Sequence, residues 1–462
     1  MTNLSGANLN SGAAVGPQGE GMDSPSTFPA YSAYKDSGVE WAGALPVEWQ
    51  ILKLKRAARL QSGEFITSEA IEEDAQYPVY GGNGLRGYTV AYTHNGEFAL
   101  IGRQGALCGN INYAEGKFWA SEHAVVVYPE KGIVTRWLGE LLRSMNLGQY
   151  SVSAAQPGLS VERIADLFIP VPSSIEQTQI ARFLDHEIAR IDALIEEQQR
   201  LIELLKEKRQ AVISHAVTKG LDPNVPLQDS GVEWLGEVPC SWRVIKFGIT
   251  HDKAELGGNY EAGESEEGLP LIKMGNIGRG KIKLDKVEYV SLTQDIDNGH
   301  TLKEGDFLFN TRNSLDLVGK VCVWRRELQA ALYNSNILRI SFNKSLIGSS
   351  GFVNYLLNSN LGLEQLRLIA RGTTSVAAIY YKDLSSLSFA FPLPSEQLEI
   401  ERFLDIQTTQ LDALVNAAEQ AIDLIKERRS ALISAAVTGK IDVRSWQPPA
   451  SAQAPESVQE AV

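Results

Sequence analysis

Apolar residues recur every three or four positions along two long stretches of the chain, as a helix with one buried face requires. In the first stretch they are Ile180, Leu184, Ile188, Ile191, Ile195, Ile202, Leu205, Val212 and Ala216. In the second they are Ile400, Leu404, Leu411, Leu414, Val415, Ile422, Ile425, Leu432 and Val437. About 40 helical residues span roughly 60 Å, which is longer than an ordinary globular helix. The pattern therefore predicts two long helices whose apolar seams pack on each other as a coiled-coil spacer, or two scaffold helices packed within a core.

The two stretches are copies of one sequence. The copies run from Glu176 to Asp222 and from Glu396 to Asp442 and align without a gap. Both contain Glu-Gln, Arg-Phe-Leu-Asp, Asp-Ala-Leu, Lys-Glu-x-Arg and Ile-Ser-x-Ala-Val-Thr in that order. A repeat of this length indicates duplication of a structural unit.

Local signals place the ends of both helices. Pro172 and Pro394 precede them, and Gly220 and Gly439 stand where they should stop. Ser173 followed by Glu176 fits a capping box at the first start.

A second repeat precedes each variable region. Ser-Gly-Val-Glu-Trp-x-Gly occurs at 37–43 and at 230–236, followed by Pro46 and Trp49 or by Pro239 and Trp242. We interpret this entrance segment as a structural cover in which the tryptophans anchor on an apolar surface, rather than as a ligand site.

Between entrance and helix lie two regions of similar style and different sequence. In the first, a Gly-dense loop (78–88), buried strands (98–102, 124–128), a short helix (137–145) and a last strand (167–171) are predicted. In the second, we expect a strand followed by a turn at 269–277, at 305–312 and at 318–324, a helix at 352–357 and a final strand at 387–393.

Composition and charge restrict the function. With 44% hydrophobic and 21% charged residues, the 462-residue chain is ordinary globular material for two to four domains. A net charge of −13 argues against a nonspecific nucleic-acid binder, although a local basic surface remains compatible with it. Cys108, Cys240 and Cys322 have no metal spacing, which fits a cytoplasmic protein. We expect neither a secretory signal nor a membrane span.

Catalytic motifs fail when tested. Gly319-Lys320 lacks the remainder of a P-loop, no amino-methyltransferase motif is present, and the histidines are scattered. We therefore expect no catalysis by this chain alone and no metal site.

The repeated helix and entrance motifs resemble the conserved regions of Type I restriction–modification specificity subunits. So do the stretches Tyr-Pro-Val-Tyr-Gly-Gly-Asn-Gly (77–84) and Gly-Asp-Phe-Leu-Phe-Asn (305–310). The resemblance covers about 34 to 442. It implies an α/β (α+β) fold with two globular target recognition domains, joined by two long antiparallel coiled-coil helices in a pseudo-twofold internal repeat.

The resemblance also implies the domain plan and the partners. The composition of the two ends, rich in Gly, Ser, Asn, Ala and Pro at the start and in Pro, Ala, Gln and Ser at the end, predicts disordered tails at 1–33 and 444–462. Between them we expect recognition domain 1 (34–172), spacer helix 1 (173–222), recognition domain 2 (223–394) and spacer helix 2 (395–443). In this family each domain reads half of a split double-stranded DNA site, and the helices dock two modification (methyltransferase) subunits. A restriction (endonuclease and translocase) subunit joins them. The chain itself would hold no cofactor, since S-adenosylmethionine, ATP and Mg belong to the partners.

Polar residues in the Gly-rich loops are candidates for base contacts, because Arg pairs with guanine and Asn or Gln with adenine. They are Asn83, Arg86, Arg103, Gln104, Asn276, Arg279, Asn310, Arg312 and Asn313. Candidates for phosphate contacts are Lys53, Lys55, Arg56, Arg59, Lys281, Lys283 and Lys286. Candidates for partner docking on the outer helix faces are Lys206, Arg209, Lys426 and Arg429. For each single position, a solvated or turn-stabilising role is the alternative.

Two rival functions remain open at this point. One is a DNA-free scaffold with two α/β interaction modules on a coiled coil, and the other is an enzyme with an unrecognised site.

Overall fold

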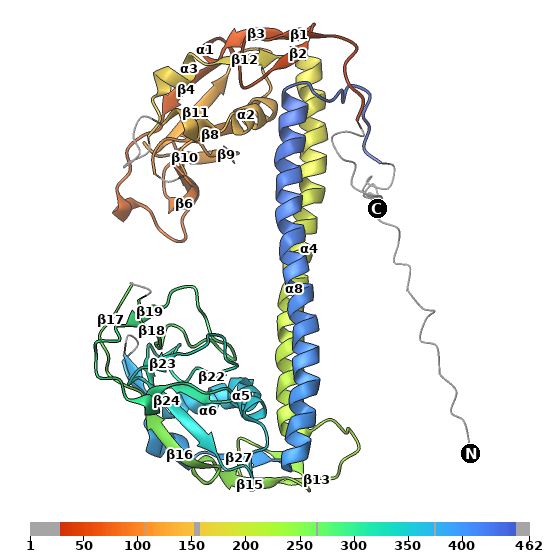
Figure 1. The fold of residues 1–462 in the computed structure, drawn as a ribbon. Coiled ribbons are helices and arrows are strands. Elements are labelled where there is room, and N and C mark those ends of the chain that lie inside the picture. The colour runs from red at the N-terminus through yellow and green to blue at the C-terminus, as the bar shows by residue number, and fades with distance from the viewer. Residues whose placement is uncertain (1–27, 106, 152–157, 265–266, 374–375, 450–462) are drawn as a thin grey trace, which may run out of the picture. The chain divides into compact units, whose positions relative to one another are not determined.

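The computed structural model describes residues 28–105, 107–151, 158–264, 267–373 and 376–449 (Figure 1). The chain divides into two compact units. Unit 1 comprises residues 1–198 and 420–462, and unit 2 comprises residues 199–419. Each unit therefore combines one globular region with half of each long helix.

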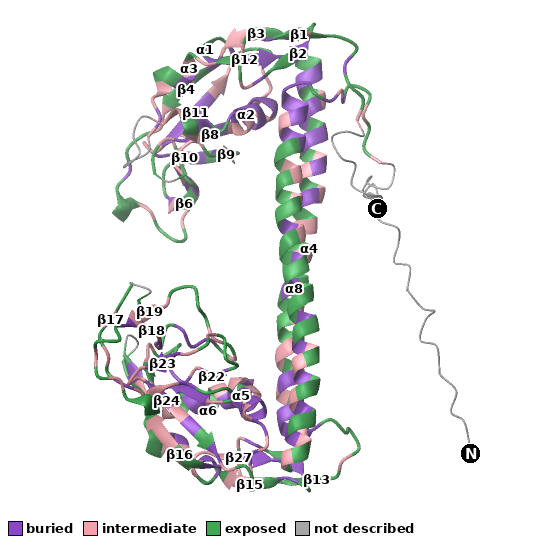
Figure 2. Ribbon diagram, viewed as in Figure 1, coloured by how far each residue is buried: buried purple, intermediate pink, exposed green. Residues whose placement is uncertain are grey.

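The two long helices are α4 (Ser174–Lys219) and α8 (Pro394–Val437), of 46 and 44 residues. In each unit, one half of α4 lies antiparallel along one half of α8 (Figure 1). Their facing sides are buried and their outer sides exposed (Figure 2). The two helices predicted from the apolar periodicity are confirmed.

The globular region of unit 1 is built from short strands and three further helices. Its strands are β1 (Tyr34–Asp36), β2 (Ala44–Pro46), β3 (Gln50–Lys53), β4 (Ala58–Ser62), β5 (Tyr77–Gly81), β6 (Gly84–Thr89), β7 (His94–Asn95), β8 (Phe98–Gly102), β9 (Ile111–Ala114), β10 (Lys117–Ala120), β11 (Ala124–Pro129) and β12 (Phe168–Val171). Its helices are α1 (Leu54–Ala57), α2 (Thr135–Ser144) and α3 (Val161–Ala165).

Unit 2 repeats this construction. Its strands are β13 (Leu227–Asp229), β14 (Glu237–Pro239), β15 (Arg243–Lys246), β16 (His251–Leu256), β17 (Ala262–Gly263), β18 (Leu269–Ile272), β19 (Glu288–Val290), β20 (Phe307–Asn310), β21 (Arg312–Asn313), β22 (Val321–Val323), β23 (Leu332–Tyr333), β24 (Ile337–Phe342), β25 (Arg371–Gly372), β26 (Ala377–Ala378) and β27 (Ser388–Phe391). Its helices are α5 (Ser350–Asn358), α6 (Asn360–Ile369) and α7 (Tyr381–Ser386).

The sheets show that the two globular regions share one topology although their sequences differ. The central antiparallel sheet has the order β4-β11-β8-β9 in unit 1 and β16-β24-β20-β22 in unit 2. The strand that leads into each long helix pairs with the strand after the entrance segment, as β12 with β3 and β27 with β15. The strands predicted before each long helix and in each sheet core are present.

Each hydrophobic core takes residues from both long helices. In unit 1, Ile180 and Leu184 of α4 join Leu432 and Val437 of α8. In unit 2, Ile400 and Leu404 of α8 join Ile213 of α4. Burial of these apolar side chains is the main force that fixes each globular region to its half of the helix pair.

The predicted disordered tails need correction next to unit 1. Tyr31 is buried, and its hydroxyl donates to Glu176 Oε1 at 2.6 Å. Phe28 and Trp446 both meet the Phe183 ring edge to face, at centroid distances of 5.1 and 5.3 Å. Order therefore begins before residue 34 and continues beyond 443, because aromatic side chains cover the outer face of α4. The rest of the predicted tails, 1–27 and 450–462, lies outside the described residues.

Candidate nucleic-acid interface

A tryptophan of each entrance segment joins the start of one long helix to the end of the other. Trp49 donates from Nε1 to Glu176 Oε1 at 3.0 Å, and Trp242 donates to Glu396 Oε1 at 3.0 Å. A Cβ on Gly439 would meet Trp49, and one on Gly220 would meet Trp242. Both glycines have positive φ, +70° and +80°, so they end their helices and leave room for the indole. The predicted apolar anchoring of both tryptophans is confirmed.

The glutamine that follows each of these glutamates clamps the globular region onto the helix start. Gln177 donates to Pro172 O at 3.0 Å and accepts from Val134 N, just before α2, at 2.9 Å. Gln397 donates to Pro392 O at 2.9 Å and accepts from Gly348 N, just before α5, at 3.0 Å. The repeated Glu-Gln pair is thus a structural joint. The capping box is only half formed: Ser173 Oγ accepts from Glu176 N at 3.3 Å, while the Glu176 carboxylate serves Trp49 and Tyr31.

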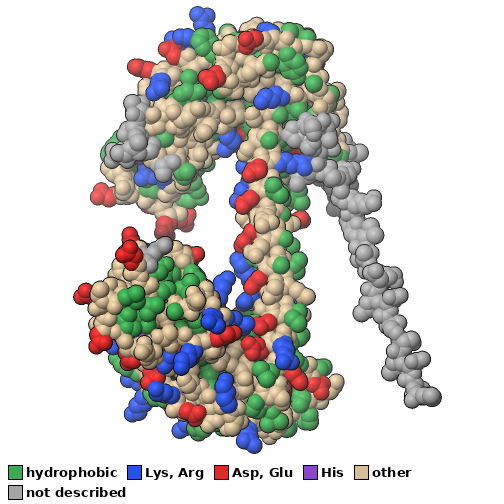
Figure 3. All heavy atoms as spheres, viewed as in Figure 1, with side chains coloured by type: hydrophobic (Ala, Val, Ile, Leu, Met, Phe, Trp, Pro, Cys, Tyr) green, Lys and Arg blue, Asp and Glu red, His purple; other side chains and the backbone are tan. Residues whose placement is uncertain are grey.

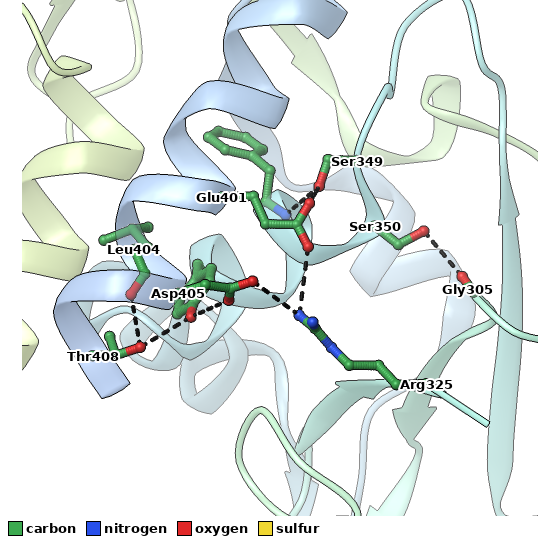
Figure 4. A network of polar contacts seen from close by, with 10 residues as sticks. Gly305, Arg325, Ser349, Ser350, Glu401, Leu404, Asp405 and Thr408 are labelled. Carbon is green, nitrogen blue, oxygen red and sulfur yellow. Dashed lines mark hydrogen bonds and ion pairs between the residues drawn. The ribbon is translucent and has the colours of Figure 1, made fainter. Parts of the chain in front are cut away.

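A polar network adds a second joint in unit 2 (Figure 4). Arg325 lies 3.5 Å from Glu401 and 3.6 Å from Asp405, both on α8. Glu401 also accepts from the Ser349 hydroxyl. The Tyr355 hydroxyl donates to Asp405 at 2.7 Å, and burial raises the pKa of Tyr355 to about 12. These contacts fix the orientation of the second globular region on its half of the helices.

In unit 1 the structure brings three predicted base-contact residues together. Asn83 is exposed at the turn between β5 and β6, and the backbone of Gly82 packs against Gln104 and Gly102. Asn83, Arg103 and Gln104 therefore lie on adjacent backbone segments, although Arg103 already donates to Ser62 Oγ at 3.1 Å. Arg86 is exposed, and the methylene groups of its side chain pack against Gly81.

Asn112 was not predicted, and it lies beside this group. It lies on β9 with its side chain against Gly84, and its Nδ2 has no hydrogen-bond partner among the described residues. That nitrogen is itself buried, so Asn112 borders the β5–β6 turn without offering this donor to solvent. The only signal in the sequence is its position between Ile111 and Tyr113 in an alternating strand.

In unit 2 two residues predicted as base contacts are buried. Asn276 is buried and clamps its own loop, donating to Lys283 O at 2.9 Å and Lys286 O at 2.8 Å. Asn310 is fully buried at the end of β20, where its Oδ1 accepts from Arg312 N at 3.2 Å. A side chain enclosed by its own loop cannot reach a base edge.

The other predicted contacts of unit 2 differ in accessibility. Arg312 is exposed beside a pocket of about 680 Å³ that Tyr380 and Tyr381 also line. Asn313 is half-buried, and its Oδ1 accepts from Ser314 N at 2.9 Å. Arg279 is exposed and donates to Asp316 O at 3.0 Å.

The predicted phosphate contacts also separate into two groups. Lys53 and Lys55 pair with Asp166 at 3.3 and 2.7 Å, and hydrogen bonds from Lys55 and then Lys53 lower the pKa of that carboxyl. Arg59 lies 4.0 Å from the Tyr128 ring centroid, whereas Arg56 is exposed. Lys286 lies 3.9 Å from Glu264, while Lys281 and Lys283 are exposed. In unit 1 the Asp166 carboxylate thus neutralises part of the charge of the predicted phosphate-contact residues.

Of the predicted docking cations, Lys206 and Lys426 are exposed. Arg209 and Arg429 are half-buried and pair across the helices with Asp412 and Asp192. Within the described residues, no group of three or more His, Cys, Asp or Glu side chains is arranged to hold a metal ion. None of the helices in the described part of the chain is long and apolar enough to cross a membrane.

Comparison with known proteins relates the chain to one family. Residues 46–204 match the family model described as the Type I restriction modification DNA specificity domain. The EcoprrI specificity subunit of Escherichia coli is 43% identical over 153 residues, which are 33% of this chain and 37% of that protein. A putative type I specificity subunit of Haemophilus influenzae, S.HindORF215P, is 24% identical over 388 residues, 83% of this chain and 93% of that protein.

The fold has a solved counterpart. A chain solved to explain complex assembly and conformational transition of the type I R-M system superposes with a TM-score of 0.66. It covers 86% of this chain and 99% of its own length at 17% identity. The family model and the relatives support the resemblance found in the repeated motifs, and the solved chain confirms the predicted fold of two globular regions on two long helices.

Proposed function

We infer that the chain is a specificity subunit of a Type I restriction–modification system, in which each globular region recognises one half of a split DNA site. The observation that carries this inference is the duplication. Two regions with one strand order and different loop sequences are attached by the same Trp–Glu and Gln joints to one repeated helix pair.

A split site needs two reading surfaces at a fixed separation and rotation along the duplex, where one turn is about 10 base pairs. A continuous helix holds both quantities constant, since each residue adds about 1.5 Å and about 100°. We propose that α4 and α8 set the number of unread base pairs. Because the loops of the two units differ, the two half-sites should differ as well.

We further propose that the chemistry belongs to partner subunits. The outer faces of the helices, with the exposed Lys206 and Lys426, are the surfaces on which two methyltransferase subunits would dock. A restriction subunit would join the same assembly. With a net charge of −13, the isolated chain should bind DNA weakly, and the complex should bind tightly in a salt-sensitive way.

Methylome sequencing of the host with and without this gene tests the function. Loss of one bipartite methylation mark is the expected result. An unchanged methylome, with the partner subunits expressed, would reject it and favour a DNA-free scaffold. Replacing residues 243–392 with the corresponding region of another such chain should change only one half of the mark. A change in both halves would contradict the division of labour between the units.

A further inference from the structure

The loop between β18 and β19 in unit 2 carries cations that lack carboxylate partners. Arg279, Lys281 and Lys283 are exposed on a narrow hairpin, closed by a hydrogen bond from Gly278 N to Lys281 O at 2.9 Å. The clamp made by Asn276 holds the base of this loop. The three side chains therefore project from a fixed backbone.

Two further cations from distant parts of the chain complete a cluster. Gly280 N donates to Val321 O at 2.8 Å, which places the hairpin tip beside Lys320. A Cβ on Gly319 would contact Leu366, so Arg367 at the end of α6 borders the same region. Arg279, Lys281, Lys283, Lys320 and Arg367 are hereafter the basic cluster.

Several other cations of this unit are already paired with carboxylates, and Arg279 and Lys281 line one pocket with Glu327, Asp405 and Asp412 without pairing with them. Arg209 pairs with Asp412, Arg325 with Glu401 and Asp405, and Arg339 with Glu255 and Asp306. In the part of the chain that the structure describes, no member of the basic cluster forms an ion pair. Figure 3 shows Lys and Arg side chains, with Asp and Glu side chains among them, on unit 2 beside the long helices.

Burial, and then the neighbouring positive charges, lower the pKa of two members of the cluster. Burial lowers the pKa of Lys320, and the charges of Lys283 and Arg279 lower it further. Burial and then Arg367 lower the pKa of Arg279. Five like charges held together in an acidic protein are unfavourable until an anion covers them. A polyanion with regularly spaced charges is the ligand that this surface fits.

We propose that the basic cluster is a phosphate-binding surface for duplex DNA, and that it supplies a larger share of the salt-dependent affinity than Lys53 and Lys55 of unit 1. The proposal rests on the proposed function and adds Lys320 and Arg367 to the DNA-binding residues. It also proposes that Arg279 contacts a DNA phosphate rather than a base. In unit 1, Asp166 already neutralises Lys53 and Lys55.

The test compares two double variants of the full-length chain that remove the same charge. One is Lys320→Gln/Arg367→Gln, and its matched control is Lys53→Gln/Lys55→Gln. Binding to a fluorescein-labelled random-sequence duplex of about 30 base pairs is measured by anisotropy over about 20–200 mM KCl. Each lost phosphate contact should reduce the slope of log K against log salt by about 0.9 and weaken binding about eightfold at 0.1 M salt. For the cluster variant we expect a smaller salt slope and weaker binding, and for the control variant we expect the slope and affinity of the wild type.

Three outcomes would overturn the proposal: no slope change in the cluster variant, an equal change in both variants, or no binding by the wild type even at the lowest salt. An equal change would mean that net charge alone matters. Thermal unfolding at matched midpoints excludes misfolding, and single Lys320→Arg and Arg367→Lys variants should retain the slope. The methylome comparison keeps the two ideas separate. If the methylation mark is lost with the gene but the salt slope is unchanged in the cluster variant, only the phosphate-binding surface is rejected and the proposed function stands.

Discussion

The guanidinium of Arg209 in α4 lies 2.8 Å from the carboxylate of Asp412 in α8, and the repeat forms the same pair again. In unit 1 the equivalent residues, Arg429 and Asp192, lie 3.4 Å apart. Because each pair joins one copy of the repeated helix to the other, both satisfy the same antiparallel register. A shift of either helix by one turn would separate both pairs at once.

Reversing the charge of Asp412 should lower the free energy of unfolding, and reversing the charges of both Arg209 and Asp412 should restore it. Asp412→Arg places two cations opposite each other. Since both groups are partly exposed, the expected loss is about 0.5–1 kcal/mol in the free energy of unfolding. Arg209→Asp/Asp412→Arg should recover most of it. Denaturant unfolding of the four proteins in a double-mutant cycle gives the coupling energy. A coupling near zero would show that the apolar seam alone fixes the register.

The Trp49–Glu176 bond should contribute more, because both partners are buried. Trp49→Phe keeps an aromatic ring but removes the donor to a carboxylate, which should cost about 2 kcal/mol in the free energy of unfolding. Trp41→Phe is a suitable control, since that half-buried indole donates to Phe168 O at 3.3 Å near the surface. Equal losses in chemical unfolding of the two variants would contradict a special role for the joint.

The frame of the molecule could be predicted from the sequence because the signal for it is repeated. The helix periodicity, the glycine stops and the paired tryptophans occur twice, and each instance supports the other. The predicted DNA-contact residues have no such repeated signal, because the sequences of the two globular regions differ. Asn276 and Asn310 look like base-contact residues in Gly-rich loops, but their amides hold the loop backbone. The amino-acid sequence alone does not show whether such an amide faces the loop backbone or the solvent.

Two other features depend on tertiary structure. Lys320 and Arg367 join the hairpin at Arg279 only after folding, so no local pattern marks them. Phe28 and Trp446 lie in stretches of low apolar content, and their partner Phe183 is distant in sequence. Composition therefore predicted disorder where a few aromatic contacts produce order.

Stability should fall as the pH falls through about 6.5, because two histidines are held in their neutral form. Burial lowers the pKa of His94, which lies 2.7 Å from the Tyr128 hydroxyl. Burial likewise lowers the pKa of His251, which lies 2.8 Å from the Tyr381 hydroxyl. With a folded pKa below the unfolded one, the unfolded chain binds more protons in this window, so acid favours unfolding.

Urea unfolding between about pH 7.5 and about pH 5.5 measures this effect. His94→Gln/His251→Gln should show a smaller pH slope than the wild type in that range. A slope of the same size in the double variant would assign the acid sensitivity to other groups.

Substitution of a loop amide that stabilises the backbone should reduce stability, whereas substitution of an exposed loop amide should change DNA recognition. Asn276→Ala leaves Lys283 O and Lys286 O without their donor, which should cost about 2 kcal/mol of stability. Asn83→Ala removes an exposed side chain and should change stability by less than about 0.5 kcal/mol. Asn83→Ala or Gln104→Ala should instead relax the half of the methylation mark that unit 1 reads. Unfolding curves and methylomes of the three variants distinguish the roles. A relaxed mark in the Asn276 variant without loss of stability would restore its direct role.

Lengthening both helices should lengthen the unread part of the DNA site. Seven residues inserted after Gln198 and seven after Glu419 add about two turns to each helix, so the buried seam continues almost in phase. The insertions add about 10 Å along the axis, which matches about three base pairs at 3.4 Å per step. Three base pairs turn the duplex by about 110°, whereas seven residues turn each helix by only about 20° from a whole number of turns, so the DNA must twist to bring both half-sites into phase. Methylome sequencing should then show the same two half-sites with a spacer about three base pairs longer. A control with four residues in α4 alone breaks the register of Arg209 with Asp412 and should lose the mark. An unchanged spacer in a stable, active double insertion would mean that the helices do not measure the site.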